Sequence, residues 1–148
     1  MSTYTQIIYQ IVFHAKGNER TLSKDKRDDL FKYITGVLKN KKCHLYIING
    51  VEDHIHILTH LHPTVALASL VKDIKLSSSD FIKSNRLFLG FTGWQEGYGA
   101  FTYSIKEKQV LINYIKNQEE HHKKVSFREE YIDFLKEHDT DFDEKYLL

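Results

Sequence analysis

The chain has 148 residues, of which 41% are hydrophobic and 28% are charged, and its formal net charge is +1 at pH 7. No run approaches the roughly 20 consecutive apolar residues of a membrane span, and the lone Cys43 excludes an internal disulfide. Since the N-terminus also lacks a charged and apolar leader, we expect one cytoplasmic domain that spans residues 1–148 and has no membrane segment.

The small net charge conceals an uneven distribution along the chain. Residues 126–148 carry eight acidic and three basic side chains, whereas residues 1–125 carry eighteen basic and twelve acidic ones. A basic body with an acidic tail is compatible with a polyanionic partner. Charge alone, however, favours the plainer interpretation of an ordinary mixed surface.

Strand and helix patterns alternate in the first half of the chain. Stretches rich in β-branched and aromatic residues predict strands, and an apolar stripe at helical spacing predicts a helix. Ser23 is placed to cap this helix, and Asn49-Gly50 is typical of a tight turn in an antiparallel hairpin. In chain order these elements are a strand over 4–14, a helix over 23–42, a strand over 45–48 and a strand over 54–60.

The second half contains a long helix, a loop rich in glycine and aromatic residues, a strand and two further helices. Capping boxes that begin at Ser104 and Ser126 predict where the last two helices start. The expected elements are a helix over 65–86, a strand over about 99–104, a helix over 104–123, and a short helix and acidic tail over 126–148. The order β-α-β-β-α-β predicts an α+β, ferredoxin-like antiparallel sheet with helices on one face, followed by C-terminal helices.

Two patterns in this second half have both a functional and a plain structural interpretation. The helix over 65–86 places four basic side chains within a narrow arc, which either follows the phosphates of a nucleic acid or is a solvated face. The aromatic block over 94–101 either stacks on bases or, more typically, belongs to a core. The four candidate DNA-binding residues are Lys72, Lys75, Lys83 and Arg86.

The strand over 54–60 carries two histidines one residue apart. Side chains at i and i+2 of a strand point to the same face, so His54 and His56 project side by side. Ile55 and Ile57 face the opposite way, toward a core. Two adjacent imidazoles can bind a metal ion, although such a pair alone is a weak indication of a metal site.

The helix over 104–123 strengthens this indication, because Tyr114, Gln118 and His121 occupy positions i, i+4 and i+7 of one helical face. The combination resembles the HUH endonucleases, and specifically the small single-tyrosine transposases of bacterial insertion sequences and their repeat-associated relatives. The resemblance extends over almost the whole chain. Its motifs are DHIHIL at 53–58 and NYIKNQ at 113–118.

This resemblance implies a role for each motif residue. His54 and His56 would bind a divalent metal, Mg²⁺ or Mn²⁺, with Gln118 as the third ligand, and Tyr114 would be the catalytic nucleophile. The implied function is a metal-dependent transposase that cleaves and rejoins single-stranded DNA ends by transesterification through a 5′-phosphotyrosine intermediate. The family acts on hairpin-forming element ends and is dimeric, so a homodimer is expected.

Two details of the implied site stay open. Glu119, His121 and His122 crowd the same helix end as Gln118, so one of them is an alternative third ligand. The sequence also does not decide whether Tyr114 completes the site of its own subunit or that of a partner.

The residue types suit this chemistry independently of the resemblance. A tyrosine with a pKa of about 10 is a poor nucleophile at neutral pH. A divalent cation beside it favours the phenolate and polarises a phosphate oxygen. Because the phosphotyrosine conserves the phosphoester, a second strand end can reverse the step without ATP.

Other functions fit part of the pattern. A nicking enzyme of the replication-initiator type would use the same residues. A non-catalytic nucleic-acid-binding module would need aromatic side chains exposed on the sheet, and a small zinc hydrolase would use His54, His56 and His121. Replacing Tyr114 with Phe should abolish transposase or nicking activity and spare the other two functions.

Overall fold

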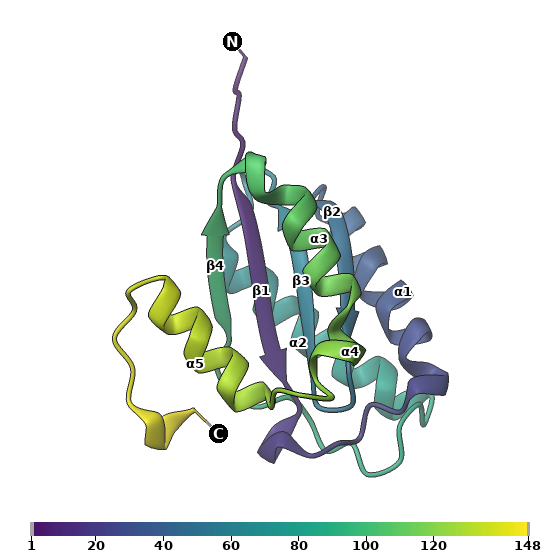
Figure 1. Cartoon of the computed structure of the whole chain (residues 1–148). Coiled ribbons are helices and arrows are strands. Elements are labelled where there is room, and N and C mark those ends of the chain that lie inside the picture. The colour runs from purple at the N-terminus through teal and green to yellow at the C-terminus, as the bar shows by residue number, and fades with distance from the viewer. Residues whose placement is uncertain (1, 148) are drawn as a thin grey trace.

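Residues 2–147 are described by the structure, a computed structural model, in which four antiparallel strands form one sheet in the order β2-β3-β1-β4 (Figure 1). Two long helices connect strands in this sheet, and the arrangement is ferredoxin-like. The predicted α+β fold class is confirmed. In chain order these elements are β1 (Ile8–His14), α1 (Lys24–Asn40), β2 (His44–Gly50), β3 (His54–His60), α2 (Leu67–Ser84) and β4 (Gly99–Tyr103).

The C-terminal helices form a second layer. Figure 1 shows α1 and α2 on one side of the sheet and the three helices that follow β4 on the other side. These helices are α3 (Lys108–Lys116), α4 (Gln118–His121) and α5 (Phe127–Glu137), and short 3₁₀ segments lie at Lys16–Asn18, Ile105–Glu107 and Glu144–Tyr146. Among residues 2–147, no helix has the length and apolar character that crossing a bilayer requires.

Alternate residues of the strands enter two different layers. Ile55 and Ile57 of β3 are fully buried in an apolar core that also contains residues of α1 and α2, as the strand pattern predicted. Leu58 packs instead with Ile115 of α3, and Val12 of β1 packs with α5. His54 and His56 therefore belong to the face that α3 and α5 cover.

Two of the three predicted helix caps are formed by side chains. The hydroxyl oxygen of Ser104 accepts a hydrogen bond from the backbone N–H of Lys106, in a complete capping box, and that of Ser126 accepts one from Glu129. Ser23 precedes α1 as expected, but its side chain makes no capping hydrogen bond.

The predicted Asn49-Gly50 turn is wrong, because both residues belong to β2 and pair with β3. A Cβ atom at position 50 would collide with the carbonyl oxygen of His54, so glycine is required by the close approach of two strands. The Asn49 amide donates a hydrogen bond of 2.8 Å to the carbonyl oxygen of Ile115. Asn49 and Gly50 therefore lie in a strand, and Asn49 binds the end of α3.

The continuous helix predicted over 104–123 is also wrong, because it breaks at Asn117. This residue has φ −97° and ψ 23°, which separates α3 from α4. The break redirects the chain at the point where the sequence placed the candidate site. Despite it, the Tyr114 hydroxyl and Nε2 of His121 remain 3.2 Å apart.

Candidate metal and tyrosine site

The two histidines of β3 are fully buried, and the Nδ1 atom of each ring makes a hydrogen bond. Nδ1 of His54 donates to a carboxylate oxygen of Asp53 at 2.6 Å, and Nδ1 of His56 donates to Oε1 of Gln10, on β1, at 2.8 Å. Since each Nδ1 faces an acceptor, Nε2 of each ring is directed into the site. Metal-binding histidines in proteins are oriented in the same way.

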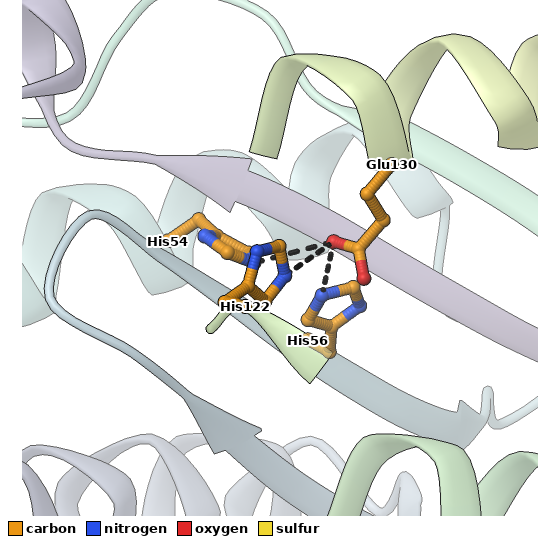
Figure 2. Close-up of side chains that lie close together, drawn as sticks. All are labelled: His54, His56, His122 and Glu130. Carbon is orange, nitrogen blue, oxygen red and sulfur yellow. Dashed lines mark hydrogen bonds and ion pairs between the residues drawn. The ribbon is translucent and has the colours of Figure 1, made fainter. Parts of the chain in front are cut away.

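Two residues from the C-terminal region meet this pair. Oε1 of Glu130, on α5, lies 3.3 Å from Nε2 of His54 and 3.0 Å from Nε2 of His56. It also lies 3.1 Å from Nε2 of His122, which follows α4 (Figure 2). One ligand atom from each of these four residues lies within 4.8 Å of the others, and this His54–His56–His122–Glu130 set is called the four-residue cluster below. Its donors are those that transition metals and zinc accept.

Gln118, the predicted third ligand, lies at the edge of this cluster. It is fully buried, with Oε1 placed 3.3 Å from Nε2 of His54, and its amide nitrogen donates to Oε2 of Glu130 at 3.1 Å. The alternative ligand Glu119 points away, since its carboxylate pairs with Arg27 of α1 at 3.1 Å.

The predicted nucleophile reaches the cluster within the same chain. The Tyr114 hydroxyl donates to Oε2 of Glu130, and its ring centroid lies 6.2 Å from that of His56. On its other side Tyr114 lines a surface cavity of about 510 Å³ together with His121. Tyr114 therefore connects the buried cluster to the surface.

The electrostatic surroundings favour a charged Glu130 and a neutral Tyr114. Burial alone would raise the pKa of Glu130, but the imidazoles of His56, His122 and His54 outweigh it and hold that pKa far below its usual range. Burial and the adjacent Glu130 carboxylate raise the pKa of the Tyr114 phenol well above its ordinary value. The phenol of Tyr114 therefore keeps its proton beside the charged carboxylate.

The two strand histidines have pKa values shifted in opposite directions. Burial lowers the pKa of His56. Burial acts in the same direction on His54, but its hydrogen bonds to Asp53 and Glu130 outweigh that effect, so the pKa of His54 is raised. In the absence of a metal, His54 therefore takes up a proton more readily than His56.

Sequence reasoning missed Glu130 and considered His122 only as one of several alternatives. A signal for Glu130 was present in α5, where it lies between Phe127 and Phe134 at positions i, i+3 and i+7. All three are buried. A charged residue on the apolar face of an amphipathic helix indicates a buried polar partner.

The basic side chains predicted to contact DNA lie elsewhere. Lys72, Lys75 and Lys83 are on α2, behind the sheet, and Arg86 follows the end of that helix. The Lys75 ammonium donates to the carbonyl oxygen of Gln95 at 2.8 Å and to that of Gly97, so it fixes the loop before β4. Trp94 of the aromatic block packs edge-on against Phe13 in the core, which confirms the core interpretation for this residue. The structure does not bring Lys72, Lys75, Lys83 or Arg86 to the cluster.

A ferredoxin-like sheet with paired histidines on a central strand, met by a tyrosine from a following helix, defines the class of HUH single-tyrosine transposases. The chain belongs to the family of IS200-like transposases, whose model matches residues 3–118. It is therefore a transposase by family, a DNA-processing enzyme, and the resemblance drawn from the sequence is confirmed.

Two solved structures share the fold. A proposed transposase from Deinococcus radiodurans R1 is 20% identical with a TM-score of 0.61, over 80% of this chain and 95% of that chain. A REP-associated tyrosine transposase bound to a REP hairpin is 14% identical with a TM-score of 0.57, over 79% of this chain and 72% of that chain. No curated protein matches the sequence.

Proposed function

We propose that this transposase cleaves and rejoins single-stranded DNA ends by metal-dependent transesterification, with Tyr114 as the nucleophile. The observation that carries the proposal is the contact between the Tyr114 hydroxyl and Glu130, whose other carboxylate oxygen faces Nε2 of His54 and His56. The proposed nucleophile and the proposed metal ligands thus converge on one carboxylate. Within one chain, this contact supports action of the tyrosine in its own subunit.

The donor set fits a divalent cation. His54 and His56 are the proposed ligands, with the amide oxygen of Gln118 beside them as the third. Within residues 2–147 the buried Nε2 of His122 lies 3.1 Å from Oε1 of Glu130 but does not form a hydrogen bond of good geometry with it, which leaves this nitrogen free to face a cation. When bound, Mn²⁺ or Mg²⁺ would act as a Lewis acid toward a phosphate oxygen and favour the phenolate.

Glu130 has a second function in this scheme, because its Oε2 accepts the hydrogen bond from the Tyr114 hydroxyl. As the phenol oxygen attacks phosphorus, the phenolic proton passes to this carboxylate oxygen. A phosphorus–oxygen bond to Tyr114 forms and the bond to the 3′ oxygen of the neighbouring nucleotide breaks. That oxygen takes up the proton that Glu130 received and leaves as a hydroxyl. Attack by a second 3′ hydroxyl on the 5′-phosphotyrosine reverses the step and joins the strands.

DNA has a direct approach to this tyrosine. The cavity of about 510 Å³ beside Tyr114 and His121 is formed by α3, α4 and the segment after them, including Lys124. Because Tyr114 lines this cavity and its hydroxyl contacts Glu130, a phosphate held there would lie beside the proposed nucleophile. The hairpin bound by the structural neighbour supports hairpin-forming DNA ends as the substrate of this chain as well.

The proposal also includes a homodimer and DNA contacts outside the site. Residues 1–148 would act as one HUH-type domain that works as a homodimer, with 126–148 as its C-terminal helix and tail. The basic residues of α2 would contact the backbone of DNA that extends beyond the site. Lys75 is the least suited of these, since its ammonium is already bound by backbone carbonyls.

The non-catalytic binding module is less well supported than the transposase. Such a module reads bases on an open sheet face. Here, α1 and α2 cover one face of the sheet, and α3 and α5 cover the other. The zinc hydrolase is also less well supported, because Nε2 of His121 is directed to Tyr114 and Oε2 of Glu130 and lies outside the four-residue cluster.

A covalent-adduct assay tests the proposed function. The protein is incubated with single-stranded oligonucleotides that carry candidate hairpin-forming element ends, with Mn²⁺ or Mg²⁺, and is then run on a denaturing gel. We expect a metal-dependent adduct that disappears in Tyr114→Phe. The matched control is Tyr33→Phe, since Tyr33 stacks on Phe81 on the far side of the sheet, and it should form the adduct normally.

Two results would contradict the proposal. An adduct that persists in Tyr114→Phe would assign the nucleophile to another residue. Absence of any adduct on the native element ends, in protein shown to bind metal, would favour a non-catalytic or hydrolytic function.

A further inference from the structure

The four-residue cluster contains more donors than the proposed function uses. Nε2 atoms of three histidines surround one oxygen of Glu130 at 3.0 to 3.3 Å (Figure 2). His122 and Glu130 lie beyond residue 118, where the match to the family model ends. They are therefore features of this chain that the family assignment does not explain.

The hydrogen bonds around the histidines fix which nitrogen carries the hydrogen. Like the two strand histidines, His122 has its Nδ1 next to an acceptor, the carbonyl oxygen of Val125 at 2.7 Å. In its neutral form, each of the three rings therefore directs a lone pair on Nε2 toward an acceptor oxygen of Glu130. The Nε2 atom of His122 is buried and, among the described residues, makes no hydrogen bond there.

Four electron-pair donors facing one another are unfavourable without a positive charge between them. A proton on His54 would satisfy only its own contact with Glu130, whereas one divalent cation satisfies all four atoms at once. Ligand atoms at about 2.0–2.1 Å from a tetrahedral zinc ion are about 3.4 Å apart. The three separations from Glu130 are within a few tenths of an ångström of that spacing, and all four ligand atoms lie within 4.8 Å of one another.

We propose that His122 and Glu130 are ligands of the same cation as His54 and His56, and that the bound cation fastens α5 to the sheet. This inference rests on the proposed metal site, and it replaces Gln118 with His122 and Glu130 in the ligand set. His54 and His56 come from β3, His122 follows α4, and Glu130 comes from α5. The cation thus joins three segments of the chain, and α5 otherwise contacts the sheet through apolar side chains such as Phe127 and Phe134.

The donor set also determines which metals fit. Three imidazole nitrogens and one carboxylate oxygen suit Zn²⁺, Co²⁺ and Mn²⁺ better than Mg²⁺, which prefers oxygen ligands and retains water. With one carboxylate against a divalent ion, the site keeps a net positive charge. That charge favours a phosphate group at the cluster edge, where Gln118 and Tyr114 lie.

Metal binding by the purified full chain, stripped with a chelator, tests the inference without DNA. Co²⁺ alone is the probe, because its visible absorption distinguishes tetrahedral from octahedral coordination. Glu130→Gln and His122→Gln should each weaken Co²⁺ affinity by at least about tenfold and lose the tetrahedral absorption. Matched controls are Glu137→Gln, exposed later on the same helix, and His62→Gln, in the loop after β3, which should bind Co²⁺ normally.

Hydrogen–deuterium exchange of the unmodified chain gives a second test that requires no variant to fold. Adding Co²⁺ should slow exchange of the α5 amides, since the cation holds that helix on the sheet. Unchanged exchange in α5 on metal binding would overturn the inference. So would unchanged Co²⁺ affinity in Glu130→Gln and His122→Gln accompanied by loss of affinity in Gln118→Ala.

The inference and the proposed function fail in different ways. If both cluster variants lose Co²⁺ binding but no DNA adduct forms in the unmodified protein, the metal site stands and the transposase mechanism fails. If the Tyr114-dependent adduct forms while both variants retain full Co²⁺ affinity, the mechanism stands and the four-ligand site fails. Circular dichroism of each variant confirms that it is folded before affinities are compared.

Discussion

The two faces of β3 have very different requirements, although their residues alternate along one strand. On one face Ile55 and Ile57 enter an apolar core with α1 and α2. On the other, His54 and His56 are equally buried but are surrounded by polar partners from β1, α4 and α5. The first face needs only complementary volume, whereas every polar atom of the second needs a partner of the right kind in the right place.

The two faces of β3 therefore contribute differently to the stability of the fold and to its function. Apolar burial on the α1–α2 face stabilises the fold roughly in proportion to the area removed from water. On the α3–α5 face, burying imidazoles and a carboxylate costs desolvation free energy that their hydrogen bonds and ion pairs offset. Changes on the two faces should therefore affect different measurements.

His56→Ala removes one imidazole from the cluster and should abolish metal binding. Loss of an outer-shell partner costs about 10–100-fold in metal affinity, so loss of a ligand should cost more than about 100-fold. Titration with Co²⁺ or Mn²⁺ measures this. His44→Ala, on β2 beside Tyr46, is the control and should bind normally. Normal metal affinity in His56→Ala would remove His56 from the site.

Ile57→Ala, one residue along the strand, should lower stability without affecting the metal. Truncating a fully buried isoleucine typically costs about 2–5 kcal/mol of unfolding free energy. Urea denaturation measures this cost, with Leu76→Ala at an exposed position of α2 as the control. If Ile57→Ala were to weaken metal binding as strongly as His56→Ala does, the two faces would not be independent.

Metal affinity should fall as the pH is lowered, because the histidine ligands must be neutral to bind. The pKa of His54 is raised and that of His56 is lowered. As the pH falls, protons therefore compete with the metal ion first at His54. Affinity is then full above the raised pKa of His54 and falls about tenfold per pH unit below it. Metal titrations between about pH 8 and about pH 5.5 test this. Affinity that stays constant down to about pH 5.5 would argue against histidine ligands.

Glu119→Gln should have the smallest effect, since this carboxylate lies outside the cluster. Its carboxylate is about half exposed in its ion pairs with Lys24 and with the buried Arg27, and pairs of exposed groups are worth about 1 kcal/mol or less. Arg27 keeps its hydrogen bond to the carbonyl oxygen of Leu22. We expect a small drop in unfolding free energy and unchanged Co²⁺ affinity. A large loss of affinity would restore Glu119 as a metal ligand.

Local sequence patterns predicted most of the elements and part of the candidate site. The alternation over 54–60 predicted which side chains share a face, and the capping boxes at Ser104 and Ser126 predicted where the later helices begin. These features depend on residues close in sequence, so a strand or helix period determines them. The motif residues His54, His56, Tyr114 and Gln118 were found in this way, and their roles remain predictions.

Only the tertiary structure brought Glu130 and His122 to the histidine pair. Glu130 is 74 residues from His56 in the sequence, and no local period relates them. The break at Asn117 and the position of α5 decide which side chains meet there. Asn49-Gly50 shows the same limit, since a dipeptide typical of turns is placed in a strand by the approach of β3 and the end of α3. Sequence periodicity determines the direction of a side chain from its own element, but the packing of distant elements determines what that side chain meets.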